Sequence, residues 1–125
     1  MIKQEVELVL NLDGTITTGD GKLSWKAPYA GELIAVGGDI TTLGSGAGTS
    51  TDVQVRNSTQ AKDMLSTVGA FEVNSATNLL EAAVVNQANC AFAKNDVLMM
   101  DVDAISTGPA NARIRLFVVL FMDDL

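Results

Sequence analysis

Residues 97–122, VLMMDVDAISTGPANARIRLFVVLFM, contain two runs with the pattern of β-strands, separated by a Gly-Pro pair. Side chains alternate between the two faces of a strand. One face of the first run therefore carries both Asp101 and Asp103. The second run carries Arg113 and Arg115 at the same spacing and then becomes apolar on both faces over residues 116–122. How these two strands are placed decides the architecture of the fold.

Two arrangements of these strands are open. In a hairpin, Asp103 would oppose Arg113 and Asp101 would oppose Arg115, in exposed pairs worth about 1 kcal/mol or less. In a sandwich whose last two strands lie in opposite sheets, both carboxylates would face water. Both arrangements place the aspartates on a solvated face, so replacing both by asparagine is expected to change stability by no more than about 1 kcal/mol.

The rest of the chain has the same β character. Short alternating or β-branched runs recur, and turn-forming pairs such as Asp13-Gly14 and Gly37-Gly38 separate most of them. The expected strands are 5–10, 22–27, 33–41, 51–57, 63–67, 71–74, 97–105 and 112–122. Many short strands at this spacing predict an all-β fold, an antiparallel sandwich of about eight strands or a barrel. A length of 125 residues predicts one domain over 1–125.

The segment 75–96 departs from this pattern. Ser75 could cap a short helix that ends near Val85, because Leu79, Leu80 and Val84 fall roughly on one face. A long loop with a turn of structure explains the same residues, and we favour the loop.

Composition excludes several classes of function. The formal charge of −7, with only eight Lys and Arg, argues against binding to nucleic acid. The longest clean apolar run, residues 116–122, is too short to cross a membrane as a helix. The chain has one cysteine, Cys90, so no intrachain disulfide can form. An apolar content of 47% against 18% charged residues suggests that some apolar surface is covered by another chain.

Motif chemistry points away from an enzyme. The sequence has no histidine, which removes Ser-His-Asp and Cys-His nucleophiles and every imidazole zinc site. The glycine-rich stretch 42–51 lacks the lysine of a phosphate-binding loop. Residues 11–21 lack the ligand spacing of a calcium loop. We therefore expect no catalytic residues, no cofactor and no metal.

Two sets of residues are candidates for binding. In the last strand, Phe117, Val119 and Phe121 share one face, and the opposite face is also apolar. A strand with the core on one side must be covered on the other. A neighbouring subunit is the simplest cover, although segment 75–94 could fold over this face instead. The second set is Trp25 and Tyr29, which could stack on a sugar or could lock a corner of the sandwich.

Three stretches in order resemble a family of small β proteins of tailed bacteriophages. They are GDGKLSWKAPYAGELIAVGGDITTLGSGAGTSTDVQVRN (19–57), KDMLST (62–67) and NDVLMMDVDAISTGPANARIRLFVVLFM (95–122). Such sequences are similar to jelly-roll domains displayed on virions, as head decoration (cement) proteins or as the heads of fibres. The resemblance covers about four fifths of the chain.

The resemblance implies an eight-stranded jelly roll, commonly a homotrimer, without enzymatic activity. It implies a protein made in the host cytoplasm and placed on the outer capsid surface, with the major capsid protein as its partner. The first expected strand begins close to the start of the sequence, which favours a decoration protein. The alternative is a glycan-binding or fibre-head domain.

Overall fold

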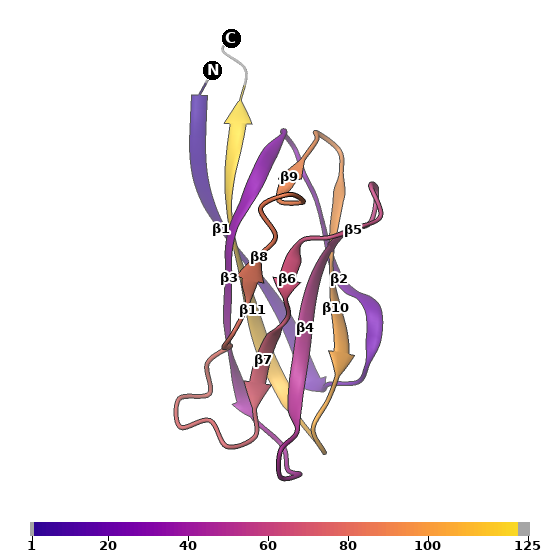
Figure 1. The fold of residues 1–125 in the computed structure, drawn as a ribbon, viewed down its shortest axis with the longest axis vertical. Coiled ribbons are helices and arrows are strands. Elements are labelled where there is room, and N and C mark those ends of the chain that lie inside the picture. Colours follow the sequence, from indigo (N-terminus) through magenta and orange to yellow (C-terminus); the bar gives the residue numbers. More distant parts are fainter. Residues whose placement is uncertain (1, 123–125) are drawn as a thin grey trace.

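The computed structural model describes residues 2–122 and shows an antiparallel β-sandwich (Figure 1). Residues 1 and 123–125 of the expected domain lie outside the described part. Between residues 2 and 122 there is no helix, and hence none that could span a membrane. The strands are β1 (Ile2–Thr15), β2 (Gly19–Lys26), β3 (Gly31–Thr42), β4 (Ser50–Asn57), β5 (Lys62–Asp63), β6 (Leu65–Thr67), β7 (Gly69–Glu72), β8 (Val84–Val85), β9 (Ala91–Phe92), β10 (Val97–Ala104) and β11 (Ala110–Met122). The prediction of an all-β sandwich is confirmed.

Two sheets make up the sandwich. The first has the order β1-β11-β3-β9, and the second has the order β2-β10-β4-β5, with β7 also paired to β4. Strands β6 and β8 form a small third sheet. The expected strand 63–67 is divided at Met64, because β5 pairs with β4 whereas β6 pairs with β8. Met64 itself is fully buried, and its N–H donates to the Val55 carbonyl.

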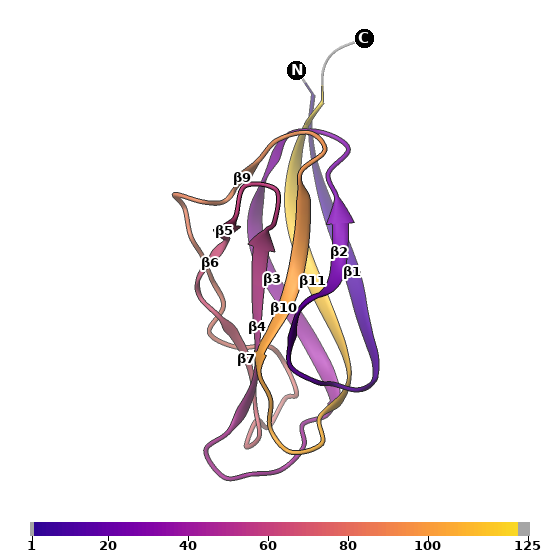
Figure 2. The ribbon, with the colours of Figure 1, turned by 90° about the vertical axis from the view of Figure 1, so that its right-hand side faces the viewer.

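The last two long strands lie in opposite sheets, so the hairpin arrangement is wrong. Strand β10 pairs with β2 and β4, whereas β11 pairs with β1 and β3. Both strands contribute buried apolar side chains to one core cluster, and Figure 2 shows the ribbons of the two sheets that carry these strands. A hairpin would instead place them side by side in one sheet. The buried side chains that meet across the core from these two strands are Leu98, Met100, Val102, Ile114, Leu116 and Val118.

Segment 75–94 closes one side of the sandwich. Its N-terminal part follows β3: Leu79 bridges Asp39, and the Leu80 N–H donates to the Gly38 carbonyl at 2.9 Å. Further along, β8 pairs with β6, and β9 pairs with β3. The helix alternative is wrong, because this backbone hydrogen-bonds to neighbouring strands. The favoured loop is correct only in part, since the segment also contains the short strands β8 and β9, which the sequence pattern did not indicate. The segment does not cover the outer face of β11, where Phe117 stays exposed.

Candidate interaction surfaces

The outer face of the β1-β11-β3 sheet carries the predicted apolar residues. Phe117 is 36% exposed and lies between Glu7 on β1 and Ala35 on β3. Val119 and Phe121 are half-buried on the same face. The structure therefore brings the three predicted residues onto one surface, and Phe117 is its most exposed member.

A β-bulge enlarges this surface. The register of β3 against β11 shifts between Phe117 and Val118, because Ala35 opposes Phe117 whereas Leu33 opposes Val118. Ile34 is the extra residue of the bulge, and both Ile34 and Ala35 are exposed. An extra residue breaks the strict alternation of a strand. Sequence reasoning missed Ile34, although the run of consecutive apolar residues at 33–36 is the signal that could have indicated it.

The bulge borders a shallow groove of about 550 Å³. Its walls come from neighbouring strands and combine an apolar floor with two carboxylates. We name this groove and the adjoining side chains of Val119 and Phe121 the outer patch. The groove residues are Glu5, Val6, Glu7, Ile34, Ala35, Phe117 and Val118.

Charged side chains border the outer patch. Arg115 Nη1 donates to Glu7 Oε1 at 2.6 Å, and Arg113 holds both carboxylate oxygens of Asp39 at 3.0 and 2.8 Å. The Arg113 hydrogen bond lowers the pKa of Asp39. Lys3 Nζ lies 5.5 Å from the centre of the Phe121 ring, within range of a cation–π interaction. Both arginines of β11 thus form ion pairs with carboxylates on neighbouring strands of the same sheet, Asp39 on β3 and Glu7 on β1.

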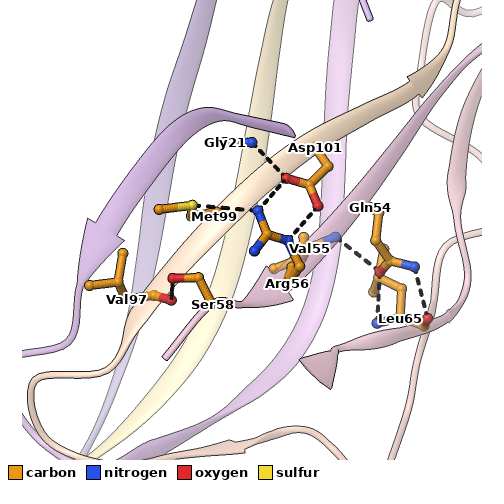
Figure 3. Close-up of polar contacts among 9 residues, drawn as sticks. All are labelled: Gly21, Gln54, Val55, Arg56, Ser58, Leu65, Val97, Met99 and Asp101. Atoms are coloured by element: carbon orange, nitrogen blue, oxygen red, sulfur yellow. Dashed lines mark hydrogen bonds and ion pairs between the residues drawn. The ribbon is translucent and has the colours of Figure 1, made fainter. Parts of the chain in front are cut away.

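Asp101 is buried, which corrects the expectation of a solvated carboxylate. It is 4% exposed, and Figure 3 shows its carboxylate between Arg56 and the backbone of Gly21. Arg56 Nε donates to Oδ2 at 2.8 Å and Nη2 to Oδ1 at 3.2 Å, while Gly21 N donates to Oδ1 at 2.7 Å. Because Asp101 accepts these bonds, it raises the pKa of Arg56. The outer face of β10 is therefore covered at this point by β2 and by the Arg56 side chain.

Asp103, two residues further on, is exposed as expected. Partial burial raises its pKa, and nearby carboxylates add to this effect. The carboxylates that contribute are Asp101, Asp20, Asp63 and Asp52. Within residues 2–122, no group of three acidic or cysteine side chains is placed to hold a metal ion.

The two candidate sugar-stacking aromatics lie in different environments. Trp25 is half-buried and meets the Phe92 ring edge to face, with centroids 5.8 Å apart at 87°. Tyr29 is 39% exposed in the turn between β2 and β3. Trp25 packs against the core, as expected for a corner lock. Sugar stacking by this pair stays a prediction.

Comparisons with known proteins identify the fold but no family. No protein-family model matches the sequence. No curated protein sequence matches it either. The structure is similar to a chain in the acid-stable capsid structure of Helicobacter pylori bacteriophage KHP30, with a TM-score of 0.53. The match covers 95% of this chain and 94% of the phage chain, at 12% sequence identity. The protein thus shares, over nearly its whole length, the fold of a chain found in a bacteriophage capsid.

Proposed function

We propose that this protein is a bacteriophage head decoration protein that binds the assembled major capsid protein lattice from outside and stabilises the head. The observation that carries the proposal is the fold match to a phage capsid chain, which spans almost the whole of both chains. The ordered sequence stretches that resemble phage decoration proteins lie within the matched fold.

The outer patch supports a second part of the proposal, a homotrimer. An exposed aromatic residue with apolar neighbours, bordered by ion pairs, has the apolar centre and polar rim of a protein interface. We propose that Phe117, Val119 and Phe121 contact a neighbouring copy. A trimer would bind the capsid through three modest contacts. Linked contacts can raise apparent affinity by roughly 10²–10⁴ where the lattice presents three matching sites.

Replacing Phe117 by aspartate is expected to shift the protein from trimer toward monomer. The charge would be desolvated at the centre of the interface, whereas in the monomer it would remain exposed to water. Ser24→Asp is the matched control, because Ser24 is exposed on the other sheet. Light scattering at micromolar concentration measures the species, and thermal melting checks that both variants fold. A wild-type protein that is already monomeric at this concentration would contradict the trimer.

Capsids that carry the protein are expected to withstand heat better than bare capsids. A ligand that binds only the assembled state stabilises that state by mass action. Thermal release of the genome or of a packaged dye measures the difference, and co-sedimentation with empty capsids measures binding. A pull-down with unassembled capsid subunits should recover little protein. Equal release temperatures, or tight binding to the subunits, would defeat the proposal, and selective binding on a glycan array would favour a sugar-binding role.

A further inference from the structure

Strand β1 is an edge strand whose N-terminal end is exposed. It pairs with β11 from Ile2 onward, and no described strand pairs with its other side. Residues 2–5 are exposed at four consecutive positions, and Ile2 is 51% exposed. Figure 1 shows this end of β1 as the outermost strand, extending with the end of β11 past the loops of the second sheet. The backbone groups along such an edge are a template for pairing with another strand.

The side chains at this edge are complementary in charge and polarity when two copies of the strand pair antiparallel. Residues 2–6 are Ile-Lys-Gln-Glu-Val, which places apolar, basic, polar, acidic and apolar side chains in order. Suppose that a second copy pairs antiparallel about a two-fold axis at Gln4. Lys3 then opposes Glu5 of the second copy on the outer face, twice by symmetry. On the inner face, Ile2 opposes Val6 of the second copy, and the two Gln4 side chains lie opposite each other.

The face assignment follows from the observed register. Lys3 and Glu5 pair with Phe121 and Val119, whose side chains lie on the outer face. Ile2 and Val6 pair with Met122 and Val118, which belong to the inner face. Directly opposite residues of antiparallel strands share a face, so the opposite charges would meet on one side and the apolar side chains on the other.

Charge selects this register among those centred on residues 3–6. A centre at Lys3 opposes two lysines, a centre at Glu5 opposes two glutamates, and a centre at Val6 opposes Glu5 to Glu7. Like charges directly opposite are destabilising. Glu7 is moreover held by Arg115 at 2.6 Å. The Gln4 centre has only opposite-charge pairs on the outer face.

We propose that the β1 edge binds the β1 edge of a second copy in this register, which would join two four-stranded sheets into one continuous sheet. The contact involves five residues of each copy, which is small for a stable interface. It would therefore operate where copies are held close together, as on a capsid surface. The edge adjoins the outer patch, since Glu5 and Val6 belong to both. Phe117, the most exposed residue of the patch, takes no part in the edge contact, so the two proposals can be tested with different variants.

Disulfide trapping tests the register. In a Cys90→Ala background, Gln4→Cys places two cysteines directly opposite each other, within the Cα separation that a disulfide needs. Glu5→Cys is the matched control, because its two copies would lie diagonally, roughly 7–8 Å apart. In a glutathione redox buffer, a non-reducing gel should show covalent dimers at least tenfold more abundant for Gln4→Cys. Equal or greater cross-linking of Glu5→Cys would overturn the proposed register.

Charge reversal tests the pairing chemistry in the Gln4→Cys background. Lys3→Glu and Glu5→Lys should each raise the protein concentration needed for half-maximal cross-linking about tenfold, because each opposes like charges. An equal mixture of the two variants should restore cross-linking as a mixed dimer, since each glutamate of one chain then faces a lysine of the other. Glu32→Lys, at an exposed position of β3 in the same sheet, controls for net charge and should have little effect.

The readout separates this proposal from the proposed function. The gel counts covalent pairs whether or not the protein also forms trimers, and Phe117→Asp should leave the Gln4→Cys cross-link unchanged. Failure of capsid binding would likewise leave it unchanged. If charge reversal has no effect, or if the mixture does not recover cross-linking, the two-fold edge contact is wrong.

Discussion

Replacing Gly31 by alanine is expected to destabilise the fold by about 3 kcal/mol or more. Gly31 lies in β3, where it pairs with Leu120 of β11 and with Phe92 of β9. A Cβ atom at this position would collide with the backbone carbonyl of Val119 and would lie 2.8 Å from Phe92 Cζ. The carbonyl belongs to a central strand and cannot move without disturbing its pairing. Thermal melting should show a fall of about 10 °C or more.

Gly37→Ala is the matched control for this prediction. Gly37 lies in the same strand, but a Cβ there would meet only Phe117 Cε2 at 3.7 Å, an ordinary van der Waals contact. Alanine also loses less conformational entropy on folding than glycine. We therefore expect Gly37→Ala to change stability by less than about 1 kcal/mol, in the stabilising direction. Equal losses for the two variants would contradict the close approach of Gly31 to β11.

Asp101→Asn is expected to destabilise the protein by about 2–4 kcal/mol. The substitution preserves shape but leaves the Arg56 guanidinium without its counter-charge. Both carboxylate oxygens accept hydrogen bonds, Oδ1 from Gly21 N and Arg56 Nη2, and Oδ2 from Arg56 Nε. Whichever way the new amide is turned, its NH₂ group faces an N–H donor. Denaturant unfolding at neutral pH measures the loss.

Asp103→Asn provides the comparison on the same strand. Burial and the neighbouring carboxylates raise the pKa of Asp103, so the folded state disfavours its charged form. Its contribution to stability therefore increases as the pH falls through the folded pKa, and at neutral pH its charge is a cost. Asp103→Asn should leave stability within about 0.5 kcal/mol of wild type or raise it slightly. Similar losses for the two variants would mean that Asp101 is not buried in an ion pair.

The Asp101→Asn and Asp103→Asn variants are expected to behave differently, although the sequence analysis treated the two aspartates alike. Alternation places Asp101 and Asp103 on one face of β10, but the register of β10 against β4 shifts between Val102 and Ala104, so Asp103 is an extra residue where the alternation is broken. The alternation of side chains does not show which residues cover this face of β10. Arg56 is 45 positions away in sequence and reaches Asp101 only because β4 pairs with β10. Because Asp101 is buried in this ion pair, we expect the replacement of both aspartates to cost more than the roughly 1 kcal/mol that a solvated face predicts.

The outer patch was predicted in part. The last strand is apolar on both faces, which correctly indicated that Phe117, Val119 and Phe121 share a surface outside the core. Ile34 joined them through a bulge, and a bulge depends on the match between two strands that are far apart in sequence. The edge of β1 was not identified at all, since nothing within residues 2–6 shows that this strand is last in its sheet.

The sequence by itself determined the β character of the chain, most of its strand positions and, between bulges, which side chains share a face. These are local properties, because backbone preference, turn residues and the two-residue repeat act over a few positions. Only the tertiary structure decided that β10 and β11 lie in opposite sheets, that Arg56 neutralises Asp101 and that segment 75–94 closes the side of the sandwich. Each depends on which strands become neighbours, and that choice is made by burial of apolar faces across the whole chain at once.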